Sequence, residues 1–140
     1  MQQIHDGSIL SPAGFRAGHA RCGIKSTEGG PDVALLTSTP PAAAAGVFTQ
    51  NRFAAAPVHW CRSVLPTDEL RAVVVNAGNA NACTGDQGER DVRATAELTA
   101  ELLECAPSQV AVASTGIIGH TLPMDRLSTG VRDAHEVLSD

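Results

Sequence analysis

The residues best placed to do chemistry are Ser114, Thr115 and Gly116, two hydroxyl side chains followed by a glycine. They directly follow residues 110–113, a short apolar run that predicts a buried strand. A turn here would present the Thr115 hydroxyl and the Gly116 N–H at the end of that strand, because glycine lets the backbone approach a ligand closely. Two such donors can form an anion site or an oxyanion hole. The alternative at this stage is a plain turn capped by Ser114 and Thr115.

A second candidate is an asparagine-rich stretch, residues 76–85, which reads NAGNANACTG. It directly follows residues 71–75, where three consecutive valines predict the clearest buried strand of the chain. Asparagine tolerates left-handed backbone angles and its amide bonds nearby backbone groups, so a tight, structured loop is expected. Such a loop either ties only its own backbone groups or also borders a pocket. It contains no lysine and no phosphate-loop or G-x-G-x-x-G pattern, which excludes nucleotide binding through it.

The remaining reactive side chains give weaker signals. The histidines show no H-x-x-x-H spacing and the cysteines no C-x-x-C pair, so neither a metal site nor a bound cofactor is expected. In a cytosolic protein the cysteines are expected to be reduced and partly buried, although their spacing leaves a disulfide open. His120 directly follows the segment of the candidate turn, which makes it a weaker candidate for a residue near a pocket there. Residues 116–119 match the bare G-x-x-G of some RNA-binding loops, but the match contains no basic residue.

Length and composition indicate one globular domain, residues 1–140, with 43% hydrophobic side chains. The net charge is −5 and the ten basic residues are scattered, whereas a nucleic-acid interface needs clustered Lys and Arg. No apolar run reaches the roughly eighteen residues that a membrane-spanning helix needs. The first residues lack a basic segment followed by an apolar one, so no secretory signal is expected and a cytoplasmic location is predicted.

Short apolar runs alternate with helical periods, which predicts an α/β domain with a mixed sheet and helices packed on it. Residues 15–25 are expected to form one strand or a bent pair of strands. The sheet is expected to contain residues 33–37, 43–49, 72–75 and 110–113. Two consecutive prolines, Pro40 and Pro41, are expected to separate the first two of these strands.

Helices are expected from Pro57, from about Asp86 and from Pro123. Proline is favoured at the first helical position, and acidic residues in the first turn suit the helix dipole. One face of the last helix is apolar, and it consists of Leu127, Val131, Ala134 and Leu138. The sequence shows no mate for this face. We therefore expect the isolated chain to self-associate or to bind a hydrophobic dye.

Six short stretches together carry a family resemblance. They read AGFRA (13–17), GIK (23–25), AAGVFT (44–49), AAPV (55–58), NAGNANACTG (76–85) and STGIIG (114–119), with LPM (122–124) just after. In order and spacing, over nearly the whole chain, they resemble the N-terminal, alpha-chain part of the ornithine acetyltransferase family. These are the bifunctional glutamate N-acetyltransferases of arginine biosynthesis (ArgJ type). The resemblance implies the N-terminal region of that fold, incomplete at its C-terminal side.

The resemblance also implies a mechanism. Family members are made as one precursor that cuts itself before a threonine, which becomes the N-terminus of a second chain. The hydroxyl of that threonine attacks the acetyl donor, its own amine can serve as the base, and the acetyl group passes to glutamate. A Thr-Gly pair stabilises the tetrahedral intermediate, and that pair maps onto Thr115 and Gly116. This agrees with the donors inferred from the residues themselves.

The family's Ala-Thr-Met-Leu cleavage motif and the threonine-rich substrate-binding stretch before it have no counterpart here, and both would lie beyond Asp140. We therefore expect a fragment or truncated product that has no turnover alone. The expected partners are small amino-acid substrates and the C-terminal beta chain of the same precursor, in a hetero-oligomer of alpha and beta chains. Acetyl-coenzyme A is a possible substrate, and neither nucleic acid nor membrane is an expected partner. The alternative is a non-catalytic chain of the same fold that acts as a binding or interaction module.

Overall fold

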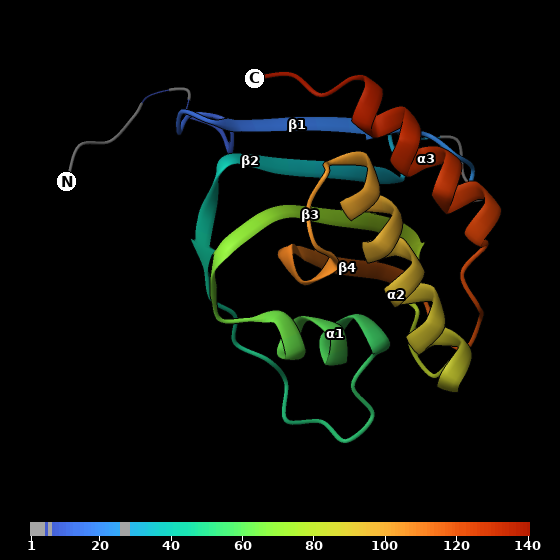
Figure 1. Cartoon of the computed structure of the whole chain (residues 1–140). Helices are drawn as coiled ribbons and strands as arrows, with labels where there is room; N and C mark the ends of the chain where they lie inside the picture. Colours follow the sequence, from blue (N-terminus) through green and yellow to red (C-terminus); the bar gives the residue numbers. More distant parts are fainter. Residues whose placement is uncertain (1–4, 6, 26–28) are drawn as a thin grey trace.

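The computed structural model describes His5, residues 7–25 and residues 29–140, so most of the Met1–Asp6 stretch lies outside it. The described residues form one four-stranded sheet and three α-helices (Figure 1). Their order along the chain is β1 (Phe15–Ala20), β2 (Val33–Ala44), α1 (Ala56–Val64), β3 (Thr67–Asn79), α2 (Gly85–Leu102), the 3-10 turn η1 (Pro107–Gln109), β4 (Val110–Ile117) and α3 (Met124–Glu136). The α/β class is confirmed.

The sheet is mixed, as expected. Its strands lie in the order β1-β2-β3-β4; the first two pairs are antiparallel and β3 runs parallel to β4. A parallel pair needs a long crossover, and here α2 supplies it. The carboxyl ends of β3 and β4 therefore meet at one edge of the sheet, which places the asparagine-rich stretch beside Thr115 and Gly116.

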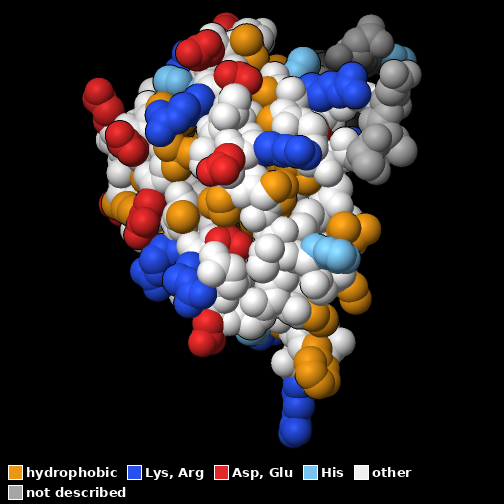
Figure 2. Space-filling model, turned by 90° about the vertical axis from the view of Figure 1, so that its right-hand side faces the viewer, with side chains coloured by type: hydrophobic (Ala, Val, Ile, Leu, Met, Phe, Trp, Pro, Cys, Tyr) orange, Lys and Arg blue, Asp and Glu red, His pale blue; other side chains and the backbone are white. Residues whose placement is uncertain are grey.

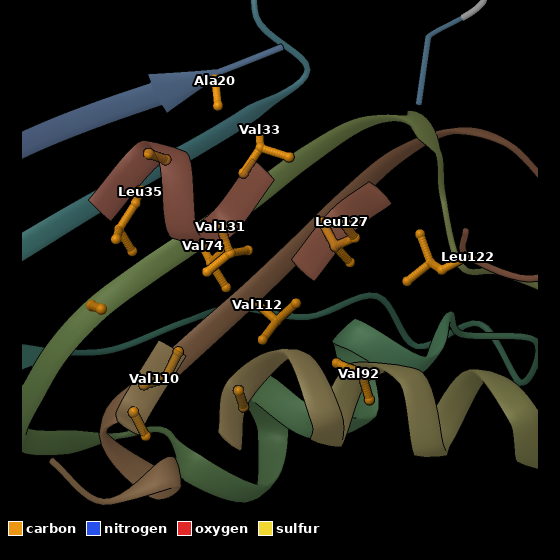
Figure 3. Packing of buried hydrophobic residues seen from close by; sticks show 14 of the residues in the cluster. Ala20, Val33, Leu35, Val74, Val92, Val110, Val112, Leu122, Leu127 and Val131 are labelled. Carbon is orange, nitrogen blue, oxygen red and sulfur yellow. The ribbon is translucent and has the colours of Figure 1, made fainter. Parts of the chain in front are cut away.

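Alternation along the strands builds the core on one face of the sheet, because successive side chains point to opposite faces. Helices α2 and α3 lie across this covered face in Figure 1, and Figure 3 shows Leu127 and Val131 of α3 close to Val74 and Val112 of the sheet. Leu127 and Val131 are at most 1% exposed. The apolar face of the last helix is therefore buried against the sheet, and the expectation that it lacks a mate is wrong.

The opposite face of the sheet carries the outward-pointing side chains, and no helix of the described chain lies across it. Val75 is 36% exposed there and Ala113 is also exposed. We call this the open sheet face, and its members are Ala34, Leu36, Val73, Val75, Ala113 and Thr115. Exposed apolar surface is thus present, as the sequence led us to expect, but the sheet provides it instead of the last helix.

Both edge strands have their backbone groups partly covered. The main chain of Ser139 exchanges hydrogen bonds of 2.9 and 3.0 Å with Ala17 of β1. At the other edge, side chains of α1 cover β4: the Trp60 indole N–H donates to the Val110 carbonyl at 2.8 Å, and the Cys61 thiol to the Val112 carbonyl at 3.2 Å. These contacts limit pairing of further strands at either edge.

Two expected boundaries are wrong. Residues 43–49 are not a separate strand, because β2 continues through Pro40 and Pro41 to Ala44 and residues 45–55 form no helix or strand. The prolines are tolerated because the partner strand β1 begins opposite Ser38, so it does not extend alongside them, and the register with β3 shifts beyond Thr37; no ladder N–H is needed there. Within residues 15–25, only Phe15–Ala20 is a strand. The three expected helices are confirmed as α1, α2 and α3.

No helix among the described residues is long and apolar enough to span a membrane. Acidic and basic side chains alternate over the side of the molecule that Figure 2 shows, with no single-sign patch on it. This mixed surface agrees with the scattered basic residues of the sequence.

Candidate active site

Thr115 and Gly116 lie inside β4, not in a turn after it. Ser114, Thr115 and Gly116 pair in parallel register with residues 76–78 of β3. The expected turn is therefore wrong, because this pairing satisfies backbone groups beyond the apolar run and extends the strand to Ile117. The expected asparagine loop is shortened for the same reason, since its first four residues belong to β3.

The Thr115 side chain points to the open sheet face, where it is exposed. None of the side-chain hydrogen bonds within the described residues involves its hydroxyl, so the hydroxyl is available to a ligand. Ser114 points to the covered face, where its Oγ is buried without a partner in the described chain. The two neighbouring hydroxyls are thus separated by the sheet, and of the two only that of Thr115 is on an exposed residue.

Gly116 packs directly against Gly78, its partner in the ladder. A Cβ at Gly116 would lie 2.2 Å from the Gly78 carbonyl carbon and 2.5 Å from the Asn79 nitrogen. The backbone at Gly116 has φ +136°, and that at Gly78 has φ +112°. Both values are unfavourable for residues with a side chain, so glycine is required at both positions.

Residues 79–82 hold the segment that follows Gly116. The Asn79 Nδ2 group donates to the carbonyls of His120 and Thr121, at 3.1 and 3.0 Å. Two backbone hydrogen bonds, of 2.9 and 2.8 Å, join the same two segments: Ala80 N–H to the Ile117 carbonyl, and Gly119 N–H to the Ala82 carbonyl. The path of residues 117–121 is therefore fixed by the end of β3.

The buried carboxylate of Asp32 holds residues 22–25 beside Gly78. Asp32 is 2% exposed and accepts N–H groups from Cys22 (2.8 Å), Ile24 (2.8 Å) and Lys25 (3.2 Å). Burial alone would raise the pKa of this carboxyl, but the hydrogen bonds outweigh it and lower the pKa to about 2. A Cβ at Gly78 would lie 3.0 Å from the Lys25 nitrogen, so the loop held by Asp32 packs directly on the strand end.

The Cys22 thiol lies beside this carboxylate. Burial, together with a hydrogen bond from the Cys22 thiol to Asp32, raises the pKa of Cys22 to about 11. A thiol with such a pKa is protonated at neutral pH and is a poor nucleophile. All four cysteines are free; Cys83 is exposed and the other three are half-buried, so the expectation of partial burial holds for three of them.

The other residues singled out in the sequence do not join this site. His120 is exposed, and it contributes its backbone carbonyl to Asn79. His59 lies elsewhere, with its Nδ1 2.8 Å from Glu89 of α2. The described residues include no group of His, Cys, Asp and Glu that could hold a metal ion. Two cavities, of about 280 and 370 Å³, adjoin the N-terminal ends of α2 and α3, and neither Thr115 nor Gly116 lines them.

Comparison with known proteins decides the family. The ArgJ family model matches residues 16–140. The chain belongs to the ArgJ family. A curated relative, the arginine biosynthesis bifunctional protein ArgJ of Symbiobacterium thermophilum, is 54% identical over 134 residues, which are 95% of this chain and 33% of the relative. The protein of the same name in Streptomyces coelicolor is 50% identical and covers 95% of this chain and 35% of its own length.

Solved ArgJ-family structures have the same fold. The ornithine acetyltransferase of Mycobacterium tuberculosis, solved in complex with ornithine, superposes with a TM-score of 0.90 at 46% identity and covers 97% of this chain and 73% of that chain. The Bacillus halodurans protein superposes with a TM-score of 0.84 at 36% identity, over 90% of this chain and 65% of that chain. The ArgJ-family chain described here thus spans about one third of the curated relatives it matches.

Asp32 is the buried group of this ArgJ-family chain that the sequence did not reveal. It stands between Pro31 and an apolar strand, where an aspartate is ordinary turn chemistry. Nothing in that spacing indicates that its carboxylate gathers the N–H groups of residues 22–25. The sequence predicts that the asparagines bond nearby backbone groups, but only the fold shows that Asn79 is bonded to residues 120 and 121.

Proposed function

We propose that this chain supplies the oxyanion-stabilising part of an acetyltransferase that passes an acetyl group from N-acetylornithine to glutamate. The donors are the Thr115 hydroxyl and the Gly116 N–H. The nucleophile is a threonine hydroxyl at the N-terminus of a second chain, released when the precursor cuts itself. As this hydroxyl attacks the acetyl carbonyl, its proton passes to the amine of the same threonine and the π electrons of the C=O bond move to the oxygen, whose negative charge the two donors stabilise. Collapse of this intermediate breaks the C–N bond and releases ornithine, which takes up the proton, and the acetyl group stays on the threonine until the amine of glutamate attacks it.

The position of Thr115 is the observation that carries this proposal. Its hydroxyl is exposed, free of hydrogen bonds within the described chain, and located at the carboxyl end of a strand in a member of the ArgJ family. Its neighbour Gly116 is held by direct packing on Gly78. An oxyanion hole needs donors that are fixed before the reaction begins, because reorganisation during the reaction would reduce their effect.

A two-chain assembly is supported by the lengths of the relatives. The chain covers about three quarters of the solved M. tuberculosis chain but only one third of the curated full-length protein of S. thermophilum. The solved chain is therefore far shorter than that full-length protein, as cleavage of a precursor would produce. We propose that the second chain packs on the open sheet face and completes a substrate pocket over Thr115, in a hetero-oligomer located in the cytoplasm.

Reconstitution tests the proposal. Co-expression of this chain with the C-terminal part of a full-length relative should transfer acetyl from N-acetylornithine to glutamate, and mass spectrometry should find an acetylated threonine on the second chain. This chain by itself should show no turnover. Acetyl-coenzyme A in place of N-acetylornithine tests the second possible donor. An assembled complex that transfers no acetyl group from either donor would contradict the proposal and favour a non-catalytic binding module.

A further inference from the structure

We propose that Asn79 is a positioning residue for acetyl transfer. Its side-chain amide holds the segment that leaves Gly116 and thereby keeps the Thr115 hydroxyl and the Gly116 N–H at the reacting carbonyl. This inference rests on the proposed function, because it assigns a role at the same site. Asn79 itself touches neither the substrate nor the reacting atoms.

The hydrogen bonds of Asn79 join the end of β3 to the segment that follows β4. Its Nδ2 group donates to two consecutive carbonyls, those of His120 and Thr121. Its Oδ1 accepts the Asn81 N–H at 2.8 Å, and its own carbonyl accepts the Asn76 amide at 2.8 Å. The residue is 4% exposed, so water does not compete for these bonds. The Asn79 side chain is therefore fixed by the Asn81 N–H while it holds the carbonyls of His120 and Thr121.

Only an amide fits this environment. A buried side chain here must offer two N–H donors to carbonyl oxygens and one acceptor to an N–H, and Asn has that combination at the length of one methylene. Aspartate has the same shape, but its carboxylate would face two carbonyl oxygens without donating to either. Alanine would leave three backbone groups unpaired, each at a cost of about 1–3 kcal/mol.

Gly116 has no side chain, so its position depends on the backbone contacts of the residues around it. The β3–β4 ladder pairs Gly116 with Gly78 and Ile117 with Asn79. Residues 117–121 are also tied to residues 79–82, and Asn79 makes the side-chain part of that connection. Loss of the connection should let the Gly116 peptide rotate and shift. A displacement near 1 Å at a catalytic group can lower the rate on the order of a hundredfold.

Asn79→Asp in the complete enzyme that carries this segment is the test, and Gln109→Glu is its matched control. The Gln109 amide also joins two backbone groups, because its Nε2 donates to the Glu69 carbonyl at 2.9 Å and its Oε1 accepts the Ala106 N–H at 3.0 Å. It lies just before β4, at the opposite end of that strand from Thr115. We expect Asn79→Asp to lower kcat by about ten- to a hundredfold with KM changed less than about threefold. Gln109→Glu should lose thermal stability and keep kcat within about twofold.

Further variants separate this inference from the proposed function. Asn79→Ser, which keeps one donor, should fall between wild type and Asn79→Asp. Combined with Thr115→Ala, Asn79→Asp should lower kcat by less than the product of the two single losses, because both act on the same donors. A slow Thr115→Ala enzyme with normal Asn79→Asp kinetics overturns this inference alone, whereas normal Thr115→Ala kinetics overturn the proposed function as well. Equal kcat losses in Asn79→Asp and Gln109→Glu, or failure of both Asn79 variants to fold, would show that Asn79 serves folding only.

Discussion

Gly78 and Gly116 lie directly opposite each other in the parallel ladder, and a Cβ at Gly116 would lie 2.2 Å from the Gly78 carbonyl carbon. This close approach lets β4 continue past its apolar run and carries Thr115 to the carboxyl end of the sheet. Backbone atoms form the contact, so neither strand can yield by changing a rotamer.

Gly116→Ala should therefore destabilise the chain strongly. The new methyl group would overlap the backbone of β3 at a φ of +136°, and we expect a loss of about 3 kcal/mol or more. Gly119→Ala is the control, since Gly119 also has a positive φ of +77° but its Cβ would meet no atom within 4 Å. That variant should lose about 1 kcal/mol. Urea unfolding of both compares them, and equal losses would show that the contact with Gly78 is unimportant.

The buried carboxylate predicts a particular response to acid. Because the pKa of Asp32 is lowered from 3.8 to about 2 in the folded chain, its ionised form stabilises the fold above pH 4, and this contribution is lost as the pH falls toward 2. At neutral pH it is worth about 2 kcal/mol. Asp32→Asn should be less stable at pH 7 and should lose less stability between pH 4 and 2 than wild type. Melting curves across this pH range measure the effect.

The acid prediction has a matched control in Asp68, an exposed carboxylate in β3. Asp68→Asn should preserve the wild-type dependence of melting temperature on pH. If Asp32→Asn and wild type lost stability in parallel over this range, the N–H groups of Cys22, Ile24 and Lys25 would not be stabilising the ionised carboxylate.

The open sheet face predicts how the isolated chain behaves without the proposed second chain. Val75 is 36% exposed at the centre of that face, so the isolated chain should bind a hydrophobic dye or self-associate. Val75→Lys should reduce both effects and should weaken assembly with the second chain. Val137→Lys, at a position that is 54% exposed just after α3, should change neither. Dye fluorescence and sedimentation velocity compare the variants; a monodisperse wild-type chain that binds no dye would contradict this account.

Much of the fold could be predicted from local pattern. Residues 33–37, 72–75 and 110–113 lie in strands as expected because apolar, β-branched runs fit a sheet buried on one face or both. The helix faces followed from their 3.6-residue period. The strand ends could not be predicted, because Asn76 and Ser114 continue their strands through pairing with each other, and no apolar signal marks that pairing. The path of β2 through Pro40 could not be predicted, because its tolerance depends on where β1 begins to pair with β2.

The candidate site was only partly predictable. Its residue types were visible in the sequence, and the role of Thr115 and Gly116 stays a prediction. The face on which each hydroxyl lies could not be foreseen, since it depends on the register of β4. A turn would have allowed Ser114 and Thr115 to share one side, whereas the strand sends them to opposite faces.

That separation gives the most direct test of the central claim, which is the kinetics of Thr115→Ala beside Ser114→Ala in the complete enzyme. Loss of the exposed Thr115 hydroxyl should lower kcat by roughly a hundred- to a thousandfold with little change in KM, and Thr115→Ser should retain most of the activity. Ser114→Ala removes a buried hydroxyl that has no partner in the described chain, so it should keep full turnover and equal or greater stability. Undiminished turnover in Thr115→Ala with a lowered melting temperature would mean that Thr115 is structural and that the oxyanion donors lie elsewhere.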